Sequence, residues 1–254
     1  MIYYPLTVMI AGGIRDFCLV STPDDLPRFR QLLGDGSDWG VSIQYREQPR
    51  PEGIAQSILI ADDFIGRDPF ALVLGDNLFF GGDAFPRAVA AFQSGATIFA
   101  YHVQDPTPYA VIELDEQNRP LSIEEKPAYP RGRFAVPGVY LYDQQAVEIA
   151  RRLKPSDRGE LEITDLNRSY LERDELNVVR LSRGFVWLDA GTSSSLFDAS
   201  AYIQTIEKRQ GIKLGCPEEA AWRRGFISTE KFKALAQRMP ACEYRKYLTE
   251  LIDS

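Results

Sequence analysis

Two aspartates stand directly after short apolar runs that have the character of buried strands. Asp76 follows the run FALVL and one glycine, and Asp189 follows the run FVWL. In open α/β sheets, ligands bind at the edge where the strands end. Carboxylates without a histidine or thiol nearby suit a hard cation. The alternative is that each aspartate caps a helix or forms a turn. The pair favours a Mg²⁺ site that bridges the protein to substrate phosphates.

Three further places carry groups that can contact a phosphate or a ring. Lys126 lies in the sequence EEKP after a strand-like run, and Arg158 precedes a helix start. Gly53 begins a helix after a loop that opens with Gln48, and backbone N–H groups at a helix start can face a ligand. Taken singly, these features have ordinary interpretations as a solvated turn, a surface arginine and a rigid loop.

A single histidine, His102, limits the chemistry that the 254 residues can perform. Zinc sites built from histidines, HExxH proteases and most Ser-His-Asp or Cys-His catalysts need more histidine or a different context for this one. Catalysis is therefore expected to rest on carboxylates, amines and a hard metal.

The charge balance and the cysteines narrow the class of protein. The chain holds 36 acidic and 29 basic residues, a net charge of −7, which argues against nucleic acid or an anionic membrane as a partner. No apolar run approaches the roughly 20 residues that span a bilayer. The three scattered cysteines and a first segment without a basic export signal fit a cytoplasmic protein with reduced thiols.

The elements that must position these groups follow from the hydrophobic pattern. Before Tyr109, apolar runs alternate with stretches of helical spacing, which is typical of strands that alternate with helices. From Tyr109, shorter runs with tight turns predict an antiparallel or mixed patch. We expect an α/β fold with a mixed, mainly parallel sheet flanked by helices. It comprises an incomplete α/β domain over residues 1–210 and a C-terminal helical extension of the same domain over 211–254.

The hydrophobic pattern also predicts individual helices. The segment 53–64 is predicted as one helix, and an amphipathic helix is predicted from Ser193 onward, with a stripe of Leu196, Ala199, Ile203 and Ile206. The last helices hold more apolar residues than a small subdomain easily buries, which indicates either a subunit contact or packing on the main domain. These residues are Phe226, Ile227, Phe232, Leu235, Tyr247 and Leu248.

Six segments together resemble one enzyme family. They are QPRPEGIAQS, LGDNLFFG, EEKP, RGELEITDLNRSYL, WLDAGTSSSL and CPEEAAWRRGFI. Their order and spacing resemble the bacterial glucose-1-phosphate thymidylyltransferases, which open dTDP-rhamnose synthesis for polysaccharides, over essentially the whole chain. The resemblance implies a Rossmann-like nucleotide-diphospho-sugar transferase fold and a homotetramer. It also implies a Mg²⁺-dependent reaction of dTTP with glucose 1-phosphate that yields dTDP-glucose and pyrophosphate.

The resemblance also assigns a role to each matching residue. Catalysis would involve Asp76, Lys126, Arg158 and Asp189, of which Asp76 and Asp189 would hold Mg²⁺. Nucleotide binding would involve Gln48, Gly53 and Asp76. Sugar binding would involve Tyr109, Glu125, Lys126, Val136, Gly138 and Trp187.

One departure from the family bears on activity. Family members carry a strand, a glycine-rich GGxGTRL loop and a lysine before the residue that matches Met1, and this sequence holds no counterpart. We therefore expect an impaired enzyme and a sheet in which two strands have unpaired edges. The open alternatives are a non-catalytic nucleotide-sugar binder and a uridylyl- or cytidylyltransferase that acts on another sugar phosphate.

Overall fold

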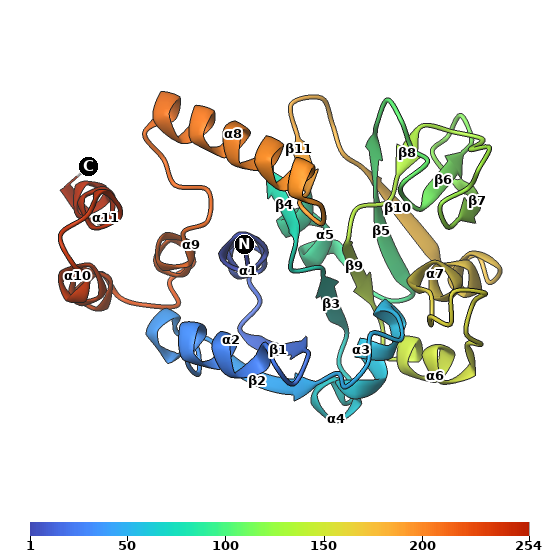
Figure 1. Ribbon diagram of the computed structural model, residues 1–254, viewed down its shortest axis with the longest axis horizontal. Coiled ribbons are helices and arrows are strands. Elements are labelled where there is room, and N and C mark those ends of the chain that lie inside the picture. The colour runs from blue at the N-terminus through green and yellow to red at the C-terminus, as the bar shows by residue number, and fades with distance from the viewer. Residues whose placement is uncertain (254) are drawn as a thin grey trace.

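Helices cover both faces of a mixed sheet, and a helical group lies at one end of the molecule (Figure 1). The computed structural model describes residues 1–253. In chain order its elements are α1 (Tyr3–Ala11), β1 (Asp16–Ser21), α2 (Leu26–Leu33), the short 3-10 helix η1 (Ser37–Trp39), β2 (Ser42–Glu47), α3 (Ile54–Ile60), α4 (Asp62–Ile65), β3 (Phe70–Val73), β4 (Asn77–Phe80), α5 (Ala84–Ala91), β5 (Ala96–His102), β6 (Val111–Leu114), β7 (Pro120–Glu124), β8 (Phe134–Ala135), β9 (Val139–Tyr142), α6 (Gln145–Arg152), α7 (Ile163–Leu171), β10 (Leu176–Arg180), β11 (Val186–Asp189), α8 (Ser193–Gln210), α9 (Pro217–Arg223), α10 (Thr229–Arg238) and α11 (Glu243–Asp253).

The mixed α/β fold expected from the sequence is confirmed, but the sheet is not mainly parallel: within residues 1–253, only β1 with β2 and β5 with β10 pair in parallel. Strand β9 lies between β3 and β5 and runs antiparallel to both, while β10 pairs with β5 in parallel. Strands β3, β5 and β10 therefore run in one direction. As expected for the segment after Tyr109, β6 pairs antiparallel with β7 and with β8.

Side chains of the central strands alternate between two apolar layers. On β9, Tyr140 and Tyr142 pack with α3, α6 and α7, whereas Val139 and Leu141 pack on the opposite side with α1 and α5. The same alternation places Ile98 and Phe99 of β5 in different layers, because successive side chains of a strand point to opposite faces. Burial on both faces explains the unbroken apolar runs in the sequence.

The sheet is divided, whereas the sequence predicted only two strands with unpaired edges. Strands β1 and β2 form a separate parallel pair, in which Phe17 lies opposite Ile43. Among residues 1–253, β3 pairs only with β9, and β1 pairs only with β2.

A two-stranded antiparallel ribbon places the ends of two distant segments together. Strands β4 and β11 pair with Leu78 opposite Leu188 and with Asn77 opposite Asp189. This register sets Asp189 beside the residue that follows Asp76.

Two helical expectations need correction. The helix predicted over 53–64 is interrupted at Ala61 (φ −93°, ψ 8°), where the backbone leaves the helical conformation between α3 and α4. On α8, only Ala199 of the predicted stripe is buried, because this helix extends along the surface and contacts mainly β11.

The C-terminal helices pack on the main domain. Phe232 and Leu248 are fully buried in one apolar cluster with Ile10 of α1 and Tyr45 of β2. Of the six apolar residues noted in this region, only Phe226 is partly exposed. Packing within the chain therefore accounts for them, and they do not indicate a subunit contact. No helix in the described part of the chain is both long and apolar enough to cross a membrane.

Candidate active site

The two predicted metal-binding aspartates lie together at the open end of the β4–β11 ribbon. The N–H of Ala190 donates to the backbone carbonyl of Asp76 at 3.0 Å, which ties the two strand ends to each other. A Cβ atom on Gly191 would lie 3.1 Å from Asp189 Oδ1 and 3.2 Å from Asp76 Oδ2. Both carboxylates therefore face the same small space, and a glycine at position 191 keeps that space open.

The electrostatic surroundings of Asp189 reflect this convergence. Burial raises the pKa of the Asp189 carboxyl, and the nearby charge of Asp76 raises it further. The N–H of Gly191, which donates at 2.9 Å, and the positive charge of Lys126 lower it. Lys126 thus lies close enough to influence Asp189, and the structure brings three of the predicted catalytic residues into one region.

The chemistry of the aspartate pair fits Mg²⁺. Hard oxygen donors are the ligands that this cation prefers, and Mg²⁺ usually keeps several waters and binds through one or two carboxylates together with substrate phosphates. Within residues 1–253, no group of three His, Cys, Asp or Glu side chains is arranged to hold a metal ion. An open pair of carboxylates fits a cation that arrives with a nucleotide better than a permanent structural ion.

Asn77 is buried at the centre of the site, and no role was expected for it from the sequence. Its amide nitrogen donates to Asp76 Oδ1 at 2.8 Å. Its oxygen accepts from Trp187 Nε1 at 2.6 Å and from the N–H of Gly138 at 3.1 Å. Asn77 therefore connects an aspartate of the pair to two predicted sugar-binding residues. The sequence feature that could have identified Asn77 is its position in LGDN, directly after Asp76.

The remaining predicted sugar-binding residues surround this link. The rings of Tyr109 and Trp187 lie 4.8 Å apart, and burial raises the pKa of Tyr109, with the charge of Asp189 adding to the effect. Val136 is buried, and its N–H donates to the carbonyl of Ala110 at 2.8 Å. The N–H of Lys126 donates to the carbonyl of Tyr109 at 3.2 Å and fixes the loop that follows β7.

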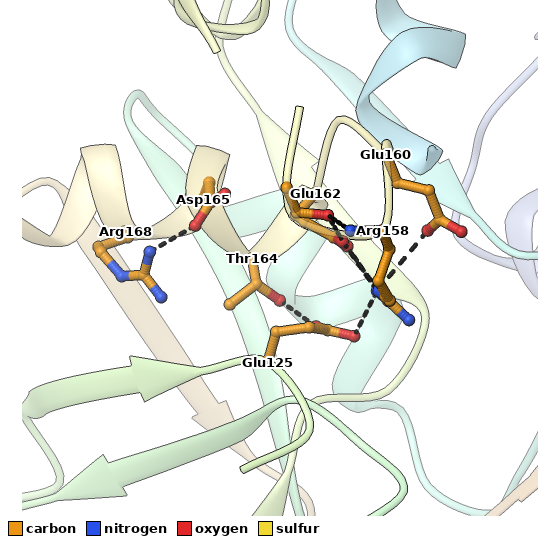
Figure 2. A network of polar contacts seen from close by, with 8 residues as sticks. Glu125, Arg158, Glu160, Glu162, Thr164, Asp165 and Arg168 are labelled. Carbon is orange, nitrogen blue, oxygen red and sulfur yellow. Dashed lines mark hydrogen bonds and ion pairs between the residues drawn. The ribbon is translucent and has the colours of Figure 1, made fainter. Parts of the chain in front are cut away.

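A second group of charged residues surrounds Arg158 (Figure 2). Arg158 Nη2 lies 2.9 Å and 2.8 Å from the two carboxylate oxygens of Glu162, and Nε donates to the same carboxylate at 3.2 Å. Glu125 and Glu160 lie farther from Nη2, at 3.5 and 3.6 Å. The Glu162 carboxylate is the main reason that the pKa of Arg158 is raised. Because Glu125 and Lys126 are adjacent in sequence, this group adjoins the aspartate pair.

The predicted nucleotide-binding residues have contacts of their own. Gln48 Nε2 donates to Gln56 Oε1 at 2.6 Å and to the carbonyl of Gly53 at 3.2 Å. Gly53 has a φ of 106°, and a Cβ atom there would lie 2.5 Å from the backbone nitrogen of Leu161. The glycine is thus required by a close approach to the segment that carries Arg158. Among the described residues, these contacts do not reach the aspartate pair.

Comparison with known proteins places the chain in a family. A family model described as nucleotidyl transferase matches residues 1–206. The chain belongs to the nucleotidyl transferase family. It is 50% identical to the glucose-1-phosphate thymidylyltransferase of Neisseria meningitidis serogroup A, over 99% of this chain and 88% of that protein. It is 49% identical to the enzyme of the same name from Mycolicibacterium smegmatis, over 100% of this chain and 88% of that one.

Solved structures agree with this membership of the nucleotidyl transferase family. A provisionally named glucose-1-phosphate thymidylyltransferase from Bacillus anthracis, solved with a sucrose, has a TM-score of 0.73 and 36% identity, over 79% of this chain and 81% of that one. A UDP-glucose pyrophosphorylase solved with UDP-glucose has a TM-score of 0.69 at 21% identity, over 80% and 86% of the two chains. The second likeness shows the fold alone.

Proposed function

We propose that this nucleotidyltransferase joins dTTP to glucose 1-phosphate and produces dTDP-glucose and pyrophosphate. The observation that carries the proposal is the near-50% identity, over 99–100% of the chain, to enzymes named for this reaction. The site supports it, because an oxygen-donor pair suited to a nucleotide-bound cation adjoins an aromatic and polar wall. The dTDP-glucose would supply dTDP-rhamnose synthesis.

The reaction needs positioning and charge neutralisation more than proton chemistry. An oxygen of the sugar phosphate forms a bond to the α-phosphorus of dTTP, and the bond from that phosphorus to the bridging oxygen breaks. Pyrophosphate leaves with the electron pair. Asp76 and Asp189 would hold Mg²⁺, which would supply neutralisation of phosphate charge. In a histidine-poor chain, oxygen ligands and cationic side chains are sufficient for this step.

The other assigned residues would hold the two substrates in line. Lys126 and Arg158 would bind the sugar phosphate. Within the described residues, Arg158 Nη1 has no hydrogen-bond partner, so it is available to a phosphate oxygen. Glu125 and Tyr109 would contact glucose hydroxyls, and the pocket would be completed by Val136, Gly138 and Trp187. Gln48 and Gly53 would bind the thymine base.

The decisive assay is pyrophosphate release from glucose 1-phosphate with dTTP, UTP or CTP and Mg²⁺. Preference for dTTP supports the proposal, whereas preference for UTP or CTP favours the alternative transferase. Binding of dTDP-glucose without pyrophosphate release in any mixture would identify a non-catalytic binder. The expected impairment stays a prediction, and turnover near the ~1 s⁻¹ of ordinary enzymes would contradict it.

The same assay tests the base-binding residue. Both Nε2 hydrogens of Gln48 already donate, to Gln56 and to the carbonyl of Gly53, so its Oε1 would accept from the imide N–H of thymine. Gln48→Ala should weaken dTTP binding by about 1–3 kcal/mol, which is typical when a buried polar group loses its partner. Unchanged dTTP affinity in this variant would remove Gln48 from the site.

We further propose a homotetramer located in the cytoplasm. On α8, Leu196 and Phe197 are 41% and 73% exposed, and large exposed apolar residues of this kind are suited to subunit contacts. The three free cysteines suit a reducing compartment. Light scattering at micromolar concentration tests the assembly, and a monomer would contradict it.

A further inference from the structure

At the start of α7, two buried polar side chains contact Glu125, assigned to the sugar hydroxyls, and Arg158, assigned to the sugar phosphate (Figure 2). Thr164 is fully buried, and Glu162, the residue that precedes the helix, is 8% exposed. Buried polar groups are nearly always hydrogen-bonded, so the identity of their partners shows what these side chains hold in place.

Thr164 holds one oxygen of the Glu125 carboxylate. Its hydroxyl donates to Glu125 Oε2 at 2.5 Å, while Glu125 Oε1 lies 3.5 Å from Arg158 Nη2. The backbone of Glu125 lies between the end of β7 and Lys126, whose φ is 41°. The carboxylate is therefore restrained at both the backbone and the side chain, and Oε1 faces Arg158, the residue assigned to the sugar phosphate.

Glu162 binds Arg158 more closely than Glu125 does. It binds Nη2 and Nε of the guanidinium and also accepts a hydrogen bond from Ser156 Oγ at 2.7 Å. With Arg158 bound tightly to Glu162, the longer contact to Glu125 leaves Glu125 Oε1 accessible to another donor. Glu125 and Arg158 are thus close together without neutralising each other completely.

We propose that Thr164 is a positioning residue that orients Glu125 for recognition of the sugar, so that α7 helps to set the affinity for glucose 1-phosphate. This inference rests on the proposed function, which assigns Glu125 to the sugar hydroxyls. Without the Thr164 hydroxyl, Glu125 Oε2 has no hydrogen-bond donor among residues 1–253, and the carboxylate moves closer to the guanidinium of Arg158, which Oε1 already contacts at 3.5 Å. That ion pair removes a sugar acceptor and a phosphate-binding cation together.

The test compares Thr164→Val, which keeps the shape and removes the hydroxyl, with Thr164→Ser, which keeps the hydroxyl. We expect Thr164→Val to raise the KM for glucose 1-phosphate by about five- to tenfold, the effect of losing one hydrogen bond of ordinary net strength. The KM for dTTP should remain within about twofold of the parent value. In Thr164→Ser, the KM for glucose 1-phosphate and the KM for dTTP should both equal the parent values. A parent-like KM for the sugar in Thr164→Val, or equal defects in the two variants, would overturn the inference.

Two further measurements separate this inference from the proposed function. Glu125→Gln should raise the KM for glucose 1-phosphate at least as much as Thr164→Val does. If Glu125→Gln has no effect in an active enzyme, the sugar assignment of Glu125 fails, and the inference fails with it. If Glu125→Gln is impaired and Thr164→Val is not, only the inference fails. Calorimetric binding of glucose 1-phosphate to the parent and Thr164→Val gives the same comparison without turnover, and equal affinities would again overturn the inference.

Discussion

The site contains two groups of carboxylates that differ in how their charge is balanced. Asp76 and Asp189 accept from neutral donors, the Asn77 amide and the Gly191 N–H. The glutamates of the other group surround the guanidinium of Arg158. The aspartate pair therefore keeps negative charge available for an external cation. The glutamate group has its own cation, whose Nη1 has no hydrogen-bond partner among residues 1–253.

The largest expected effect follows from removing charge from the aspartate pair. Asp76→Asn keeps the size and one oxygen but loses half of the charge that attracts Mg²⁺. We expect pyrophosphate release to fall by about 10²–10³-fold, because charge stabilisation is the main catalytic contribution in phosphoryl transfer. Titration of Mg²⁺ with dTTP by calorimetry should show weaker binding.

Asp83→Asn is the matched control for this substitution. Within residues 1–253, the Asp83 carboxylate pairs only with the exposed Arg87 near the start of α5, and such surface pairs contribute little. If Asp76→Asn and Asp189→Asn bind Mg·dTTP as tightly as Asp83→Asn does, the metal assignment is wrong.

An intermediate effect is expected when the internal cation is removed from the glutamate group. Arg158→Met leaves the Glu162 carboxylate buried without a positive partner, which should lower the free energy of unfolding by about 1–3 kcal/mol. It should also raise the KM for glucose 1-phosphate. Adding Glu162→Gln to Arg158→Met should recover part of the stability and none of the substrate affinity, as measured by urea unfolding and kinetics.

Arg131→Met serves as the control for loss of an arginine. Arg131 lies 4.0 Å from Glu124 and is mostly exposed, so its loss should leave stability nearly unchanged. If Arg158→Met and Arg131→Met are equally stable, the charge balance inferred for the glutamate group is incorrect.

The two groups also differ in how far the sequence could predict them. Asp76 and Asp189 were recognised because each follows an apolar run, a pattern that specifies a strand end directly. Their convergence depends on the antiparallel register of β4 and β11, which no local pattern encodes. Asn77 was missed for the same reason, because its partners Gly138 and Trp187 lie 61 and 110 residues away in the chain.

The fold shows the same division between local and long-range information. Strands such as β3 and β5 were predictable because burial on both faces produces unbroken apolar runs. Unpaired strand edges were predicted, but the separation of β1 and β2 from the main sheet was not. The interruption at Ala61 was missed, because apolar spacing continues through it, and the burial of the C-terminal helices depended on contacts with α1 and β2.

The smallest expected effect concerns Asp143, a carboxylate that neutral donors hold and that has no role in the proposed reaction. It accepts from Tyr170 Oη at 2.7 Å, from the N–H of Gly95 at 2.8 Å, and from the backbone and side-chain amides of Gln145, both at 3.0 Å. Burial alone would raise the pKa of Asp143, but these hydrogen bonds outweigh it and lower the pKa, in contrast to Asp189.

A pKa below that of the unfolded chain means that the ionised form stabilises the fold. This stability is fully present above the ordinary aspartate value of about 4 and is lost as the pH falls through the lowered pKa. The stability difference between the parent and Asp143→Asn, measured by urea unfolding, should therefore be constant near neutral pH and shrink below about pH 4. A stability difference that grows on acidification would show that burial dominates at Asp143. The contrast between Asp143 and Asp189 would then fail.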